Sequence, residues 1–224
     1  MNKLTFVDWG AIPYSKAFEK QKELFNKAIK QKSELKEAEN MIIFCEHPHV
    51  ITIGKNGSAF NLLFPEKILK EKQVELFNVD RGGDVTYHGP GQLVGYPILD
   101  LDAFHIGLKN YIFILEEIII KLLSEYGIKG ERLMGAAGVW LDAENPQKAR
   151  KICAIGVKSS HFITMHGFAL NIMTDLSYFS LINPCGFIDK GVTSMEVELN
   201  RRVYIEELKE KLKNIFLTQF SIQV

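Results

Sequence analysis

The chain has 224 residues, of which 46% are hydrophobic, and it carries 27 basic and 27 acidic side chains. This length suits one domain, or a domain with an appendage, and the apolar content is enough for a sizeable core. A net charge near zero argues against strong non-specific attraction to nucleic acid or to an anionic membrane. Three widely separated cysteines argue against a disulfide scaffold and for a reducing compartment.

Neither a signal peptide nor a membrane span is expected. The first residues lack the apolar core of a signal peptide. The most apolar run, residues 111–123, contains Glu116, Glu117 and Lys121, so it is too short and too charged to cross a bilayer. We therefore expect a cytoplasmic protein that binds neither nucleic acid nor membrane.

Short β-prone runs and a few amphipathic segments alternate along the chain. Helices are expected at residues 14–36, 62–72, 106–126 and 204–220, where apolar side chains recur every three or four positions. Strands are expected at residues 4–8, 41–46, 50–53, 74–79, 85–87, 93–99, 138–142, 151–157 and 162–172. Runs of consecutive strands with few helices indicate an α+β fold, which we place in one domain spanning residues 1–224.

The most unusual stretch is residues 81–92, which reads Arg-Gly-Gly-Asp-Val-Thr-Tyr-His-Gly-Pro-Gly-Gln. Glycine permits positive φ and lets a ligand approach the backbone closely. The stretch therefore indicates two turns around a short strand, with backbone groups able to line a pocket. An ordinary hairpin is the alternative. Neither a P-loop nor a dinucleotide-binding glycine motif is present.

Cys45, His47 and His49 crowd into five residues, so a zinc site must be considered. Zinc requires three or four ligands in a closed arrangement, and no second ligand pair follows at a suitable spacing. Pro48 also makes a regular strand doubtful here. A turn at the border of a pocket is the better interpretation, and we expect no metal.

Cys185 is the best candidate nucleophile, because it lies in a turn between Pro184 and Gly186. Cys45 and Cys153 lie in apolar runs and resemble small buried hydrophobic residues. A reactive thiol needs a neighbouring base or cation. His88, His166 and Lys151 could each supply one, and the residues alone do not decide among them.

Several motifs in this order resemble the lipoyl(octanoyl) transferase family of lipoate biosynthesis. They are Glu46-His47-Pro48, the glycine-rich stretch 81–92, the Lys-Ile-Cys-Ala-Ile-Gly-Val run at 151–157, the Thr-Met-His-Gly-Phe-Ala-Leu-Asn run at 164–171, Asn183-Pro184-Cys185-Gly186 and the Val-Thr-Ser-Met run at 192–195. The resemblance covers most of the chain. The chain departs from the commoner pattern at His49 and in the segment 158–162.

The resemblance implies a biotin/lipoate protein ligase-like catalytic domain, with a mixed sheet flanked by helices. It implies an acyltransferase that moves an octanoyl group from octanoyl-acyl carrier protein to a lysine of lipoyl domains. Such domains occur in the E2 subunits of 2-oxoacid dehydrogenases and in the glycine cleavage H protein. No cofactor is implied, and we expect a monomer.

The resemblance also implies roles for individual residues. Cys185 is the nucleophile that forms an acyl thioester, and Lys151 lowers its pKa and acts as general acid and base. The acyl-binding segments are Arg81, Gly82, Gly83, Asp84, Val85, Thr86, Tyr87, His88, Ala154, Ile155, Gly156, Gly167, Phe168 and Ala169. The alternatives are an ATP-dependent lipoate or biotin ligase, an octanoyl amidotransferase acting between lipoyl proteins, and a catalytically silent module that binds acylated carriers.

Overall fold

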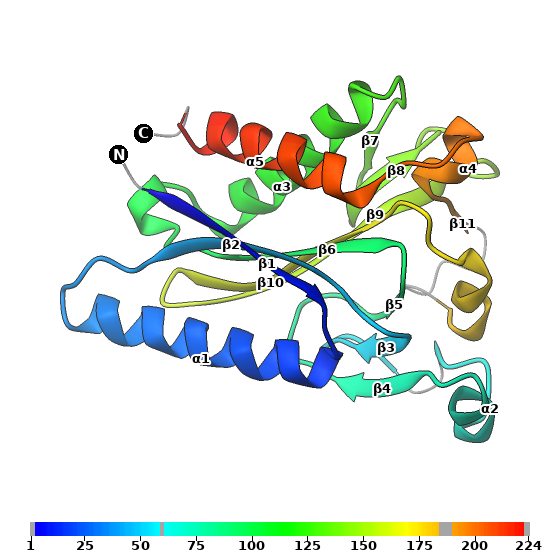
Figure 1. Ribbon diagram of the computed structural model, residues 1–224, viewed down its shortest axis with the longest axis horizontal. Coiled ribbons are helices and arrows are strands. Elements are labelled where there is room, and N and C mark those ends of the chain that lie inside the picture. Colours follow the sequence, from blue (N-terminus) through cyan, green and yellow to red (C-terminus); the bar gives the residue numbers. More distant parts are fainter. Residues whose placement is uncertain (1–2, 59–60, 184–189, 222–224) are drawn as a thin grey trace.

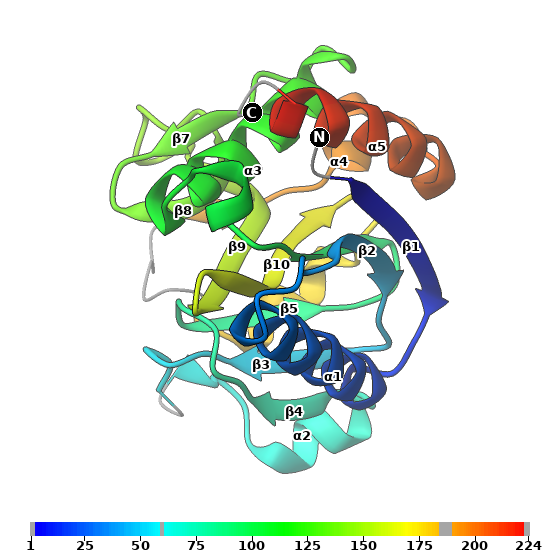
Figure 2. The same ribbon diagram turned by 90° about the vertical axis from the view of Figure 1, so that its left-hand side faces the viewer.

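A computed structural model describes residues 3–58, 61–183 and 190–221. Its main feature is a large mixed β-sheet with helix α1 on one face and helices α3 and α5 on the other (Figure 1). A smaller sheet lies beside it, next to α2 (Figure 2). No helix in the described part of the chain is long and apolar enough to cross a membrane.

The larger sheet has the strand order β1-β2-β6-β10-β9-β8-β7, and β11 pairs with β9 outside this path. Strands β1 and β2 are parallel, whereas most other neighbours are antiparallel. Every residue of the central strands β6 and β10 is buried. The bounds are Leu4–Ala11 (β1), Asn40–Glu46 (β2), Gln92–Ile98 (β6), Glu131–Leu133 (β7), Ala136–Leu141 (β8), Arg150–Ser160 (β9), Ile163–Asn171 (β10) and Gly191–Val192 (β11).

The smaller sheet has the order β4-β3-β5, with β3 parallel to β4 and antiparallel to β5. Its strands are Val50–Ile53 (β3), Glu75–Asn78 (β4) and Val85–His88 (β5). One face packs on a 3₁₀ segment, Leu176–Leu181 (η3), through a cluster that includes Ile51, Tyr87 and Phe179. A second 3₁₀ turn, Asp102–Phe104 (η2), follows β6.

The helices are α1 (Tyr14–Ser33), α2 (Glu66–Glu71), α3 (Leu108–Ser124), α4 (Met195–Leu199) and α5 (Ile205–Ser221). Helix α1 buries one stripe, with residues spaced three or four apart: Tyr14, Ala17, Gln21, Phe25 and Ala28. Helices α3 and α5 bury broader apolar faces over a large core cluster on the opposite side of the sheet. Burial of these faces, more than helix propensity, stabilises the helices.

Most expected elements are present within one or two residues of their predicted bounds, but α2 is shorter than predicted. The predicted helix began at residue 62, whereas α2 begins after Pro65. Proline disfavours helical geometry in the residue before it, and Leu62 instead forms a β-bridge with Ile182. Strands β7 and β11 and helix α4 were not predicted.

Candidate active site

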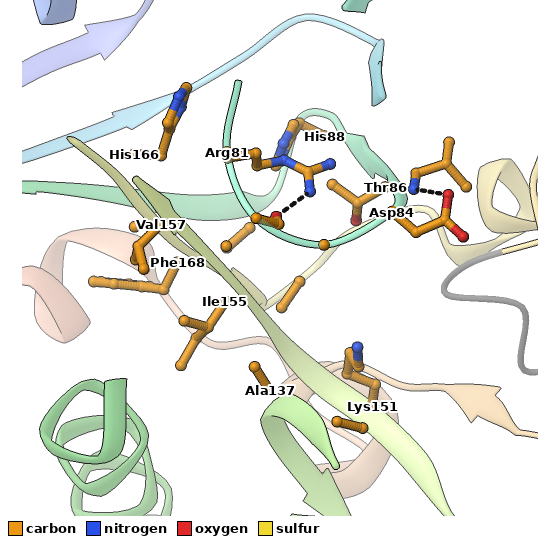
Figure 3. Close-up of a pocket in the computed structure, with 18 of the residues that line it drawn as sticks. Arg81, Asp84, Thr86, His88, Ala137, Lys151, Ile155, Val157, His166 and Phe168 are labelled. Atoms are coloured by element: carbon orange, nitrogen blue, oxygen red, sulfur yellow. Dashed lines mark hydrogen bonds between the residues drawn. The ribbon is translucent and has the colours of Figure 1, made fainter. Parts of the chain in front are cut away.

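A cavity of about 600 Å³ lies between the glycine-rich stretch and strands β9 and β10 (Figure 3). Its volume is in the range of ordinary small-molecule sites. The expected site residues that line it are Arg81, Gly82, Gly83, Asp84, Val85, Thr86, His88, Lys151, Ala154, Ile155, Gly156, Gly167, Phe168 and Ala169. Segments far apart in the sequence therefore surround one space.

The turn that carries Arg81 packs directly on β9. The Gly82 N–H donates to Val157 O at 2.9 Å. An added Cβ on Gly156 would lie 2.9 Å from Gly82 O and 3.0 Å from Arg81 Cδ, so only glycine allows this approach. The Arg81 guanidinium donates to Thr52 O and Thr52 Oγ1 at 2.9 and 3.0 Å, which fixes the turn to the smaller sheet.

Lys151 enters the cavity because of a β-bulge. Val139 of β8 pairs with Cys153, but Trp140 pairs with Lys151, so Ile152 is an extra residue on β9. A bulge changes which side chains share a face. Ile152 and Cys153 are consequently both in the buried core, whereas Lys151 lines the cavity, with its Nζ 4.6 Å from the centroid of the Trp140 ring.

Cys185 lies outside the described residues. The nearest described positions are Asn183 before it and Lys190 after it, and Lys190 lines the cavity. On the upstream side, Asn183 N donates to Asn61 O at 2.8 Å. On the downstream side, β11 pairs with the start of β9, with Val192 opposite Lys151.

Tyr87 does not line the cavity, unlike its neighbours in β5. Alternate residues of a strand point to opposite faces, so Thr86 and His88 reach the cavity and Tyr87 points away from it. The Tyr87 ring is fully buried and stacks on Tyr178 of η3, with centroids 5.1 Å apart. His49 stacks on the same Tyr178 ring at 4.2 Å, and His49 Nδ1 is 2.8 Å from the Tyr87 hydroxyl.

His88, which lines the cavity, and its buried neighbour His47 are held in the neutral form. Burial lowers the pKa of His88 to about 3, with a smaller contribution from His47, and burial lowers the pKa of His47 to about 4. Gln92 uses its amide N–H groups on Tyr87 O and Asn171 Oδ1, so His88 Nδ1–H donates to Gln92 Oε1 at 2.8 Å. These contacts order the polar wall of the cavity.

His47 and Cys45 form no metal site. His47 Nδ1–H donates to Ile12 O at 2.8 Å, and His47 Nε2 accepts from the Tyr96 hydroxyl at 2.7 Å. His49 lies instead in the stack on Tyr178. Among the described residues, no group of three or more His, Cys, Asp or Glu side chains could hold a metal ion.

His166 occupies the end of the cavity away from Lys151 (Figure 3). Its Nε2 is 3.2 Å from Asp80 Oδ1, and Lys158 Nζ contacts the other oxygen of that carboxylate at 2.5 Å. Burial lowers the pKa of His166 to about 4 even though Asp80 opposes that effect. Lys151, His88 and His166, the three candidate activating groups, all line the cavity. Lys151 is the one that lies next to β11, and His166 lies at the opposite end of the cavity (Figure 3).

Residues 13–217 match the family model of the lipoyl protein ligase A/B catalytic domain. An octanoyltransferase from Parabacteroides distasonis is 56% identical over 221 residues, covering 99% of this chain and 100% of the relative. An octanoyltransferase from Bacteroides thetaiotaomicron is 54% identical over 211 residues, covering 94% of this chain and 92% of the relative. The chain belongs to the lipoyl protein ligase A/B catalytic domain family. The predicted resemblance to octanoyltransferases and the prediction of an acyltransferase enzyme are confirmed.

Solved structures of lipoate protein ligases show the same fold. A bi-partite lipoate protein ligase from Thermoplasma acidophilum gives a TM-score of 0.71 at 15% identity, covering 99% of this chain and 85% of the other. The structure of lipoate-protein ligase A bound with ATP gives a TM-score of 0.69 at 15% identity, covering 98% of this chain and 85% of the other. At these identities the likeness shows the fold alone, and it confirms the predicted α+β, ligase-like architecture.

Three cavity residues outside the predicted set connect its parts: Gln92, Asn171 and Trp140. Gln92 and Asn171 end the motifs at 81–92 and 164–171, and their place as the last polar residue of each motif was an available signal. Trp140 had none, because its place opposite Lys151 depends on a bulge that no local pattern reports.

Proposed function

We propose that this protein transfers an octanoyl group from octanoyl-acyl carrier protein to a lysine of a lipoyl domain, through a thioester on Cys185. The observation that carries the proposal is the cavity, which is lined by the glycine-bearing segments 81–88, 154–156 and 167–169. Lys151 lies in it opposite Val192 of β11, a strand that follows Cys185 in the chain. Relatives above 50% identity that are named octanoyltransferases support the acyl group and the reaction class.

The first half-reaction exchanges one thioester for another. Lys151 takes the proton of the Cys185 thiol, and the resulting thiolate attacks the carbonyl carbon of the octanoyl thioester. The carbon–sulfur bond to the carrier breaks, and the carrier leaves as a thiol after it regains a proton. Because a thioester replaces a thioester, this step needs no ATP.

The second half-reaction forms an amide. The ε-amine of the target lysine loses a proton and attacks the Cys185 thioester, and the Cys185 sulfur is released as a thiol. Neutral Lys151 can accept the proton in this step. An amide is more stable than a thioester, so this step drives the cycle forward. The proposed acceptors are lipoyl domains of E2 subunits and the glycine cleavage H protein.

The lining of the cavity supports an apolar acyl chain as the bound group. Ile155, Val157 and Phe168 form an apolar wall, opposite the turn that carries Arg81 (Figure 3). Gly156 and Gly82 bring backbone close to this space without side chains that would fill it. The proposed octanoyl chain lies along β9 from Lys151 toward Ile155.

Intact-mass measurement after incubation with octanoyl-acyl carrier protein, without ATP, tests the proposal. We expect a single octanoyl adduct that is absent in Cys185→Ala and forms much more slowly in Lys151→Ala. If an octanoylated lipoyl domain can replace the carrier as donor, so that its octanoyl group passes through the adduct to a second lipoyl domain, the enzyme is an amidotransferase. If no adduct forms and turnover requires ATP, the protein is a ligase. If the protein binds the acylated carrier but forms no adduct and shows no turnover, it is a silent binding module.

A further inference from the structure

We propose that Trp140 is a positioning residue for the acyl transfer, because its indole face holds the Lys151 ammonium at the end of the cavity. The inference rests on the proposed function, in which Lys151 activates Cys185. Lys151 Nζ lies 4.6 Å from the Trp140 ring centroid, within the range of a cation–π interaction. Both residues line the cavity.

Backbone pairing puts the two side chains on one face of the sheet. Trp140 and Lys151 are direct partners across the antiparallel β8–β9 pair, and directly opposed residues project to the same side. The bulge at Ile152 is required for this, since regular pairing would place Ile152 opposite Trp140. Bulges near active sites commonly redirect a side chain in this way.

The Trp140 ring is itself fixed. It is 2% exposed, and its Nε1–H donates to Ala136 O, four residues earlier, at 3.2 Å. The small side chains Ala136 and Ala137 line the cavity next to it. A rigid ring beside small residues offers the lysine one favourable place, whereas the lysine stem is a flexible four-carbon chain.

The carboxylates near the start of β9 have cationic partners of their own. Arg150, the preceding residue on β9, is paired with Asp142 and with Glu198 of α4. Glu116 of α3 accepts from Arg132 and from Gly138 N. Lys190, before β11, also lines the cavity. The carboxylates around the start of β9 are thus engaged by arginines.

The consequence for the reaction is kinetic. Without the indole face, the Lys151 side chain spends less time in the geometry in which its neutral amine accepts the Cys185 proton, and the resulting ammonium is held less firmly beside the thiolate. Cation–π contacts, from exposed to desolvated ones, correspond to effects of up to roughly fivefold and thirtyfold respectively. We expect this loss in the rate of acyl-enzyme formation, and no change in binding of the acyl chain along Ile155 and Phe168.

The test compares Trp140→Phe and Trp140→Leu with the wild type. We expect kcat to fall roughly fivefold to thirtyfold in Trp140→Leu and less in Trp140→Phe, because a benzene ring attracts a cation more weakly than indole. KM for the octanoyl carrier should be unchanged. The pH profile of Cys185 alkylation should move to higher pH, and in a Lys151→Ala background Trp140→Phe should add no further loss.

The chain offers a matched control, Trp9→Leu. Lys20 Nζ lies 5.2 Å from the centroid of the Trp9 ring on strand β1, away from the cavity. This variant should behave as the wild type. Melting temperatures show which variants fold, and Trp140→Phe, which keeps an aromatic ring at this buried position, carries the test if Trp140→Leu does not fold.

Wild-type kcat in a folded Trp140→Phe and Trp140→Leu would overturn the inference, as would a fall in kcat with an unchanged alkylation profile. These outcomes differ from failure of the proposed function, which shows itself in the wild-type protein as the absence of an octanoyl adduct on Cys185.

Discussion

Gly156 of β9 and Gly167 of β10 are direct partners in the ladder that forms the floor of the cavity. Two opposed glycines leave the backbone bare, and the turn at residues 81–83 packs closely on it. An added Cβ would lie 2.9 Å from Gly82 O at position 156 and 2.1 Å from Gly95 O at position 167. These close approaches explain why residues without side chains are needed at both positions.

We therefore predict that Gly156→Ser displaces the Arg81 turn and lowers kcat/KM for the octanoyl carrier about tenfold or more. Gly167→Ala forces a Cβ against backbone and should lower the free energy of unfolding by about 1–3 kcal/mol. Gly107→Ser is the control, since a Cβ at this N-cap of α3 meets nothing within 4 Å and serine is a favourable N-cap residue. Wild-type kinetics in Gly156→Ser would contradict the close-packing argument.

The buried histidines predict that stability falls in mild acid. The pKa values of His47, His88 and His166 are lowered by burial to about 4, 3 and 4, from an ordinary value of 6.5. The unfolded chain therefore binds more protons than the folded one below pH 6.5, so stability rises with pH up to that value and is then level. Each histidine contributes roughly 1 kcal/mol per pH unit in this window.

Urea denaturation at a series of pH values measures this slope. His88→Gln should flatten it by about one histidine's contribution, even if its stability at neutral pH is lower. His161→Gln, which removes an exposed imidazole, should leave the slope as in the wild type. A stability that is independent of pH between about 4 and 6.5 would rule out neutral buried histidines.

The stack of His49, Tyr87 and Tyr178 anchors η3, which precedes the Cys185 segment. Tyr178→Leu should loosen η3 and slow acyl-enzyme formation about fivefold to tenfold, since each of the two ring pairs that it removes is worth roughly 1 kcal/mol. Tyr87→Phe keeps the rings stacked and should have a smaller effect. Tyr204→Leu, at an exposed tyrosine, is the control. Equal adduct rates in Tyr178→Leu and Tyr204→Leu would contradict this role.

Asn171 holds Thr193, which follows β11 on the C-terminal side of Cys185. Its amide donates to Thr193 O at 2.9 Å and accepts from Gln92 Nε2 at 2.8 Å. Asn171→Leu removes the partner of the buried Thr193 O and of one N–H of the buried Gln92 amide, which should cost about 1–3 kcal/mol for each. Because Thr193 N donates to Lys151 O, kcat should also fall. A matched Asn214→Leu on the exposed face of α5 should change neither quantity.

Local patterns predicted most of the fold. Residues spaced three or four apart gave α1 and α3, and β-prone runs gave β3, β6 and β10 close to their observed bounds. The motifs also predicted that the segments at 81–88, 154–156 and 167–169 belong together, and the structure places them around one cavity. The role of Cys185 stays a prediction, since it lies outside the described residues.

The direction of the Tyr87 side chain could not be predicted from its motif. Tyr87 lies in the middle of the glycine-rich stretch, yet its side chain points away from the cavity into the cluster between the smaller sheet and η3, because side chains alternate along β5 once β3 pairs with it. The pairing of Leu62 with Ile182, which replaces the predicted start of α2, likewise depends on a partner far along the chain.

The sequence by itself determined which residues could carry the chemistry, since Lys151, His88 and the glycines are visible as types in motifs. Only the tertiary structure decided how they meet. The bulge at Ile152 turns Lys151 from the core side to the cavity and sets it over Trp140. Strand register is a property of two paired segments, so no pattern within either one reports it.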